Sequence, residues 1–166
     1  MNDIKTILKM LDWNNDKSVQ KEGIEIATKT KEIEPFLQPL TDEFSKNVWD
    51  NCAKIISMKT DRELKEYTGA LLEWIEDLNW PGAIIILRRL KDFDGGLLID
   101  EYVKAVRKAS DTIHGDENWL ANLYLLFENK KLKKLIPPDI VEMFEEQFGN
   151  SSISISDFRI YDDFID

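Results

Sequence analysis

The chain has 166 residues, of which 43% are hydrophobic and 33% are charged. This composition excludes an intrinsically disordered chain and supplies enough apolar side chains for one hydrophobic core. The formal net charge of −10 disfavours binding to nucleic acid or to an anionic membrane. Because Cys52 is the single cysteine, no intramolecular disulfide forms and folding requires no oxidising compartment.

The sequence predicts a cytoplasmic protein. The first residues, Met1–Lys5, lack the basic start and the apolar stretch of a signal peptide. The longest apolar run extends from Ala83 to Leu87, and it is much shorter than a membrane-spanning helix.

Apolar residues recur at helical spacing along most of the chain, which places them on one face of successive helices. These stripes cover residues 4–11, 17–30, 44–56, 64–78, 99–106, 120–127 and 140–148. The stripe over 64–78 is the longest and predicts one helix of about four turns. The run from Ala83 to Leu87 fits a buried strand or a helix, and the preceding Pro81 together with the basic residues that follow favours a helix.

Helix starts are marked by short polar residues ahead of the stripes. We predict N-caps at Asp16, Thr41, Thr60 and Asp139, and Thr60 with Glu63 fits a capping box. The basic cluster at 130–134 follows a stripe, where cations complement a helix C-terminus.

Small residues recur in what we predict to be the second helix of successive helical pairs. They are Gly23, Ala53, Ala83 and Ala121, with spacings of 30, 30 and 38 residues. A period of this size is typical of stacked helical pairs. We therefore predict an all-α fold, an α-α superhelix of about 8–9 helices arranged as HEAT-like pairs. An irregular helical bundle is the alternative.

The domain prediction is a single helical-repeat domain over residues 1–148 and a short, irregular, acidic C-terminal tail over 149–166. In this tail, residues 152–156 alternate with period two, and aromatic and aliphatic residues then lie among aspartates. Such a tail either lies back on the last helix or docks on a partner.

Catalytic and metal-binding residue sets are missing from the sequence. His114 and Cys52 lie on separate predicted elements, so a nucleophile with an adjacent base is not expected. One cysteine and one histidine do not form a zinc site. Carboxylates at helical spacing, such as Glu73 and Glu76, are typical of a solvated helix face. We predict no metal, no cofactor and no enzyme activity.

The most distinctive local feature is the aromatic-rich turn that joins two predicted helices over residues 71–83. Trp80 precedes a proline, which favours an extended backbone, and its ring is expected to pack across the two helices. Asp77 and Asn79 are predicted to accept hydrogen bonds from the first N–H groups of the next helix. We select Asp77, Asn79 and Trp80, followed by Asp116 and Trp119, as candidate binding residues.

The string from Glu73-Trp74 through Asp77-Leu78-Asn79-Trp80-Pro81 resembles the hallmark of an uncharacterised bacterial domain family of unknown function. The resemblance extends over about residues 40–93, and the segment around Gly23 also looks HEAT-like. This resemblance supports the helical fold. Because the family has no established activity, the resemblance leaves the function open.

We therefore expect a non-catalytic protein-interaction module that presents an acidic helical surface to a protein partner of basic character. A narrower hypothesis is an immunity-like or antitoxin-like protein that neutralises a basic toxin. The opposing hypothesis is a carboxylate-dependent enzyme with a pocket between helices. The sequence leaves the oligomeric state and the identity of any partner open.

Overall fold

The computed structural model of the protein describes residues 3–38 and 45–149. Every regular element within these ranges is a helix, so the predicted all-α class is confirmed. The α-helices are α1 (Ile4–Met10), α2 (Lys17–Lys29), α3 (Trp49–Ser57), α4 (Asp61–Leu64), α5 (Thr68–Trp74), α6 (Ala83–Lys91), α7 (Gly95–Ala109), α8 (Glu117–Tyr124), α9 (Lys130–Lys133) and α10 (Pro138–Phe148). The 3₁₀ turns are η1 (Glu34–Phe36), η2 (Lys46–Val48), η3 (Lys65–Tyr67) and η4 (Leu125–Glu128). The predicted N-cap Thr41 and the tail from residue 150 onward lie outside the described residues.

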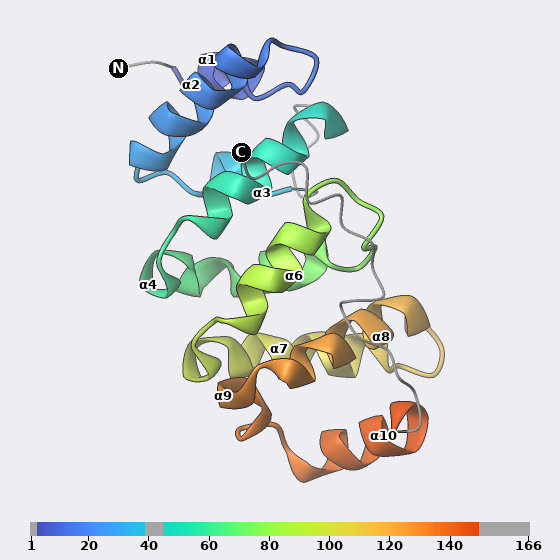
Figure 1. The fold of residues 1–166 in the computed structure, drawn as a ribbon. Coiled ribbons are helices and arrows are strands. Elements are labelled where there is room, and N and C mark those ends of the chain that lie inside the picture. The colour runs from blue at the N-terminus through green and yellow to red at the C-terminus, as the bar shows by residue number, and fades with distance from the viewer. Residues whose placement is uncertain (1–2, 39–44, 150–166) are drawn as a thin grey trace.

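The helices are stacked along one axis in the order of the chain, from α1 and α2 at one end to α10 at the other (Figure 1). Contacts link near neighbours: α1 packs on α2, α2 on α3, and α3 on α6. Further along, α5 packs on α6 and α7, and α7 packs on α8 and α9. This order is what stacked helical pairs require; the HEAT-like repeat itself stays a prediction.

Close backbone approach fixes two of the helix contacts. At Gly23, a Cβ atom would lie 2.8 Å from the Met10 Cβ, so α1 and α2 meet where no side chain fits. At Gly82, a Cβ atom would lie 2.5 Å from the Ala53 Cβ, which joins the turn before α6 to α3. Gly82 also has a φ of 78°, a backbone conformation that glycine adopts without strain.

The core is one continuous apolar cluster along the stack, and two of its large polar side chains bond to backbone carbonyls. The Tyr102 hydroxyl donates to the Leu123 carbonyl at 3.0 Å, and the Trp119 indole donates to the Leu72 carbonyl at 3.0 Å. These bonds satisfy groups that would be costly to bury alone, and they tie α7 and α5 to α8. In the described part of the chain, no helix has the length and apolar character needed to cross a membrane.

The helix prediction for the run from Ala83 to Leu87 is confirmed by α6. The prediction of one continuous helix over 64–78 is wrong, because α4, η3 and α5 divide this segment. The Thr68 hydroxyl donates to the Lys65 carbonyl at 3.2 Å, which competes with regular α-helical bonding. Gly69 follows, and its low helix propensity weakens the same turn.

The capping-box prediction at Thr60 is confirmed: its side chain accepts from the Glu63 N–H, and the Glu63 carboxylate accepts from the Thr60 N–H at 2.8 Å. Of the other two described N-cap predictions, the one at Asp16 is confirmed in position, because α2 begins at Lys17, and the one at Asp139 is wrong. The Asp16 side chain makes no cap hydrogen bond. Asp139 lies inside the first turn of α10, because the helix already begins at Pro138, a residue type well suited to a first helical position.

The expectation that the lysines at 130–134 close a preceding helix is also wrong. They begin a short helix of their own, α9, because the Asn129 side chain accepts from the N–H groups of Lys131 and Leu132. A capping side chain at this position starts a helix where charge alone indicated an end.

Candidate functional site

A groove with a volume of about 870 Å³ crosses α2, α3 and α6 and the turns that precede α2 and α6. We call it the α3–α6 groove. It is lined by Trp13, Lys17, Gln20, Asp50, Asn51, Lys54, Ser57, Met58, Trp80, Pro81, Gly82, Ile84, Ile85, Arg88, Arg89 and Asp92. Its volume lies within the range of known ligand sites.

The apolar lining of the groove includes two large side chains that the fold leaves in solvent. Trp13 is 42% exposed and Met58 is 58% exposed. Trp80 is half-buried, and the edge of its ring meets Trp49 with the ring centroids 6.1 Å apart. Exposed apolar side chains that face one hollow indicate a binding surface, whereas single scattered ones are ordinary.

Basic side chains outnumber acidic ones around the groove, in contrast with the net charge of −10 for the chain. The charged lining residues are Lys17, Lys54, Arg88 and Arg89 against Asp50 and Asp92. Arg89 also pairs with Asp61 and donates to the Lys59 carbonyl at 2.9 Å. Desolvation lowers the pKa of Lys54, an effect that the nearby Asp50 partly offsets.

A buried amide network fixes the wall of the groove that carries Trp13. The Asn51 side chain donates to the Leu11 carbonyl at 2.7 Å and to the Gln20 side-chain oxygen at 2.9 Å. Gln20 in turn donates to the Trp13 carbonyl at 3.1 Å, and the Trp13 N–H donates to the Asn47 carbonyl at 3.0 Å. The turn before α2 is therefore held against α3 by bonds from both sides.

The opposite wall is the aromatic turn that the sequence singled out. Trp74 is fully buried, and its indole N–H donates to the Pro81 carbonyl at 3.1 Å. Because Gly82 then adopts a left-handed conformation against Ala53, the chain enters α6 at a fixed angle. The tryptophan–proline motif thus positions Trp80 at the edge of the groove.

Asp77 and Asn79 do not line the groove. The Asp77 carboxylate accepts from the Asn79 backbone N–H at 2.8 Å and from its side-chain amide at 2.9 Å. The prediction that this pair caps the next helix is wrong, because the N-cap of α6 is Gly82 and no side chain bonds there. An aspartate two residues ahead of a backbone N–H closes its own local turn.

Asp116 and Trp119 lie at the start of α8, away from the groove lining. Asp116 caps α8 by accepting from the Trp119 N–H at 2.9 Å. Trp119 is buried, and its indole N–H holds the Leu72 carbonyl of α5. Both residues therefore have structural roles in this fold.

Around this helix start lies a second charged feature, which we call the acidic corner: Glu73, Glu76 and Asp116 around Lys108. The Lys108 ammonium is 3.9 Å from the Glu73 carboxylate and 5.2 Å from the centre of the Trp119 ring. Desolvation raises the pKa of Glu76; Lys108 opposes this effect, and Glu73 and Asp116 add to it. Of the five predicted residues, only Trp80 lines the groove. Asp77 and Asn79 bond to each other within the aromatic turn, and Asp116 and Trp119 lie at the start of α8.

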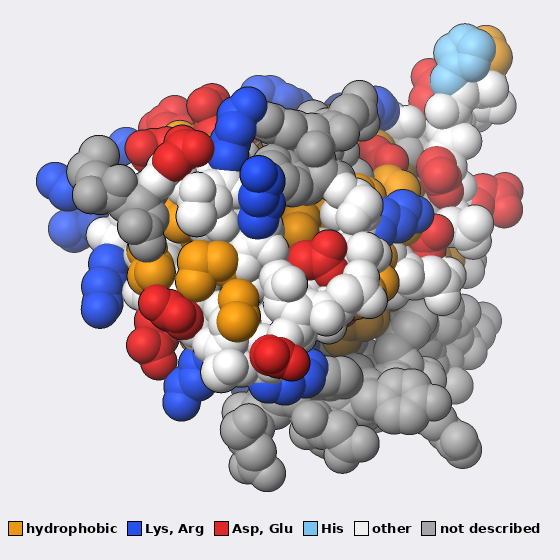
Figure 2. All heavy atoms as spheres, turned by 90° about the horizontal axis from the view of Figure 1, so that it is seen from above, with side chains coloured by type: hydrophobic (Ala, Val, Ile, Leu, Met, Phe, Trp, Pro, Cys, Tyr) orange, Lys and Arg blue, Asp and Glu red, His pale blue; other side chains and the backbone are white. Residues whose placement is uncertain are grey.

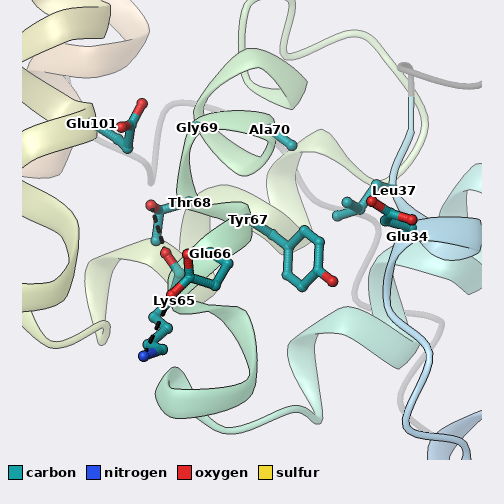
Figure 3. A pocket seen from close by; sticks show the side chains of 9 residues that line it. All are labelled: Glu34, Leu37, Lys65, Glu66, Tyr67, Thr68, Gly69, Ala70 and Glu101. Carbon is teal, nitrogen blue, oxygen red and sulfur yellow. Dashed lines mark hydrogen bonds and ion pairs between the residues drawn. The ribbon is translucent and has the colours of Figure 1, made fainter.

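A further pocket of about 590 Å³ lies between η1, η3, the start of α5 and α7 (Figure 3). Figure 3 shows Tyr67 with Leu37 on one side and Glu101 on the other. Glu66 pairs with Lys65 at 3.4 Å, and Glu101 pairs with Lys104 at 2.6 Å. Carboxylates paired with lysines in this way are typical of solvated helix faces.

Cys52 is buried in α3, and this burial raises the pKa of its thiol, which makes it a poor nucleophile. His114 lies exposed in the turn before α8. Among the residues that the structure describes, no group of three or more His, Cys, Asp or Glu side chains could hold a metal ion. At the α1–α2 end, acidic and basic side chains are interspersed with hydrophobic ones (Figure 2).

Sequence reasoning missed Trp13 and Met58, the two most exposed apolar residues of the groove. Trp13 had a usable signal, since it is an isolated aromatic residue in an otherwise polar turn between two stripes. Met58 follows the apolar stripe of its helix without a break in pattern, so no sequence signal separates it from the core.

The fold and the groove together define an all-helical protein with stacked helices and an open, partly basic apolar surface. Residues 44–147, well over half of the chain, match the family described as a domain of unknown function, DUF5071. The chain belongs to this family, and the match includes the aromatic turn. No curated protein and no solved structure matches the chain.

Proposed function

We propose that this protein is a non-catalytic protein-interaction module whose α3–α6 groove binds a segment of a partner protein. The observation that carries the proposal is the joint exposure of Trp13 and Met58 on one basic-rimmed groove with fixed walls. Apolar and acidic side chains in the partner segment would complement this lining.

The dimensions of the groove suit an extended peptide. It crosses three neighbouring helices, α2, α3 and α6, which at usual interhelical spacings of about 8–10 Å gives a length of about 20 Å. An extended segment of about six residues covers that length. Because the amide network and the Trp74–Pro81 bond hold both walls, little ordering of the groove accompanies binding, which favours affinity.

The acidic corner supports a second contact, with a basic partner. Desolvation raises the pKa of Glu76, and repulsion from Glu73 and Asp116 adds to this effect, while Lys108 opposes it. A basic partner surface would relieve this repulsion. An immunity-like protein that neutralises a basic toxin is the specific form of this second proposal, and its binding would weaken with salt because exposed charges are screened.

A library of displayed 16-residue peptides selected on the full chain tests the groove. We expect enrichment of peptides with aromatic or aliphatic residues next to aspartate or glutamate. Met58→Glu should weaken their binding at least tenfold, because it introduces a carboxylate among the apolar contacts. Ile113→Glu is the matched control, since Ile113 is 80% exposed and lies outside the groove. Equal binding by wild type and Met58→Glu would contradict the proposal.

A further inference from the structure

We propose that Met58 is an oxidation site through which hydroperoxides control binding in the α3–α6 groove. Conversion of its thioether to the sulfoxide places a polar group among the apolar contacts of a partner segment. This inference rests on the proposed function, because it names a way in which the same groove is regulated.

Met58 is the most accessible of the methionines that the structure describes. It is 58% exposed, whereas Met10 and Met143 are half-buried. Met10 lies where α1 approaches Gly23 of α2, and Met143 packs against the core. Oxidation of a methionine requires that the oxidant reach its sulfur, so a peroxide in solution meets Met58 first.

The reaction needs a hydroperoxide as its only co-reactant. A lone pair on the Met58 sulfur attacks the terminal oxygen of the hydroperoxide, so that a sulfur–oxygen bond forms and the oxygen–oxygen bond breaks. The sulfur is oxidised by two electrons, and the peroxide is reduced to an alcohol, or to water when the oxidant is hydrogen peroxide. The proton of the transferred oxygen moves to the leaving oxygen. The resulting sulfoxide is converted back to the thioether by methionine sulfoxide reductases.

The position of Met58 turns this local change into an effect on the groove. Met58 shares the lining with Ile84, Ile85 and Trp80, whose side chains offer apolar contacts to a partner segment. A thioether fits such contacts, whereas a sulfoxide gives up hydrogen bonds to water when an apolar segment covers it. Oxidation should therefore weaken the binding of apolar segments.

The Thr28 hydroxyl on α2 lies beside the sulfur. It donates to the Met58 sulfur at 3.6 Å and to the Ile24 carbonyl at 2.7 Å. Because a hydroxyl has a single hydrogen and a thioether is a weak acceptor, the bond to Ile24 dominates in the reduced protein. A sulfoxide oxygen is the stronger acceptor, so oxidation should tie the Met58 side chain to α2.

Cys52 does not compete with Met58 for the oxidant. Its side chain is fully buried, and this burial raises the pKa of its thiol, which keeps the reactive thiolate scarce. The groove thus responds to oxidation through a thioether that does not titrate.

Peroxide treatment of the full chain tests the assignment of the site. Mass spectrometry of proteolytic fragments measures oxygen incorporation at each methionine after exposure to dilute hydrogen peroxide. We expect Met58 to be oxidised about fivefold faster than Met143, with an unchanged helical circular dichroism spectrum. Equal rates of oxidation at the two residues would overturn the proposal.

The affinity of a library-selected peptide, measured before and after the same treatment, tests the effect on the groove. The wild-type chain should lose about fivefold in affinity, and methionine sulfoxide reductases should restore it. Met143→Leu keeps Met58 and should show the same loss. In Met58→Leu the affinity after treatment should equal its own value before treatment, because leucine has no sulfur to oxidise. An equal loss in Met58→Leu would overturn the proposal, since it places the sensitive group elsewhere.

These measurements separate the failure of this inference from that of the proposed function. Oxidation at Met58 with unchanged peptide affinity, while Met58→Glu still weakens binding, overturns the inference and leaves the groove function standing. A library that yields no peptide for the groove overturns both.

Discussion

The Asn129 side chain is buried and makes four hydrogen bonds at the junction of two helices. Its amide donates to the carbonyls of Leu90 and Phe93 at 3.0 and 2.9 Å, and its oxygen accepts from the N–H groups of Lys131 and Leu132. One residue thus ends α6 and begins α9. Nothing in the hydrophobic pattern marked Asn129, because the carbonyls that its amide bonds, those of Leu90 and Phe93, are distant in sequence.

Asn129→Ala should lower the free energy of unfolding by about 3 kcal/mol, since it removes a cap and leaves buried carbonyls without donors. Urea denaturation followed by circular dichroism measures the change. Asn79→Ala serves as the control, because the Asn79 side chain is exposed and bonds to the local Asp77; its expected effect is within about 0.5 kcal/mol. A similar loss of unfolding free energy in the two variants would show that the hydrogen bonds of the Asn129 side chain do not stabilise the fold.

Gly82→Ala should lower the free energy of unfolding by about 2–4 kcal/mol, because the left-handed backbone disfavours a side chain and the new Cβ meets Ala53. Gly96→Ala is the matched control in another helix start. Its Cβ would meet the Asp94 carboxylate at 3.2 Å, with no core atom near it, so little change is expected. The midpoint temperature of thermal unfolding measures the stability of both variants. Equal midpoint temperatures for Gly82→Ala and Gly96→Ala would contradict a tight contact between the turn before α6 and α3.

At the scale of the element, the capping box at α4 makes stability depend on pH. Hydrogen bonds from Thr60, first from its backbone N–H and then from its hydroxyl, lower the pKa of Glu63 in the folded state. A lowered carboxylate pKa stabilises the fold above the ordinary value of 4.5, and this stabilisation is lost as the pH falls through the lower folded-state pKa.

Glu63→Gln tests this effect, because the amide keeps an acceptor for Thr60 and does not titrate. Wild type should be the more stable protein near neutral pH, and its advantage should shrink as the pH falls below about 4.5. Chemical denaturation at a series of pH values measures the difference. A difference that stays constant across the series would show that the ionised carboxylate contributes nothing.

The elements that the sequence predicted correctly are those with a local cause. The helix α6 follows from the proline turn and the basic residues around its apolar run, and the Thr60 capping box follows from a four-residue pattern. The break between α4 and α5 was missed because the apolar stripe over 64–78 continues through η3 without interruption. Periodicity records which face is buried, and it does not record a change in hydrogen bonding within the turn.

The candidate site was predictable only in part for a related reason. Trp80 was selected because its turn is unusual in sequence, and it lines the groove. Its neighbours in the groove, Trp13 and Met58, come from segments that precede it by tens of residues. Their proximity depends on the packing of α2 on α3 and of α3 on α6, which no local pattern encodes.

At the scale of the whole molecule, the buried thiol of Cys52 reports on opening of the stack. Because burial excludes solvent and raises the pKa of the thiol, Cys52 should react with a thiol reagent only when α3 separates from its neighbours. The reaction rate should therefore rise with urea concentration in proportion to the fraction of opened molecules.

Met58→Cys is the matched control, because it adds an exposed thiol at the end of the same helix. This second thiol should react at once in the native protein, while Cys52 remains protected. Rapid labelling of both thiols without urea would show that α3 is not packed as described.

The α3–α6 groove extends across the boundary of the family domain. The match to DUF5071 begins at residue 44 and ends at 147, so Met58 and Trp80 fall inside it, whereas Trp13 falls outside it. Most of the groove lining thus belongs to the shared domain, and only the residues on α2 and on the turn before it precede that domain. The matched domain by itself, residues 44–147, would therefore lack the wall of the groove that carries Trp13.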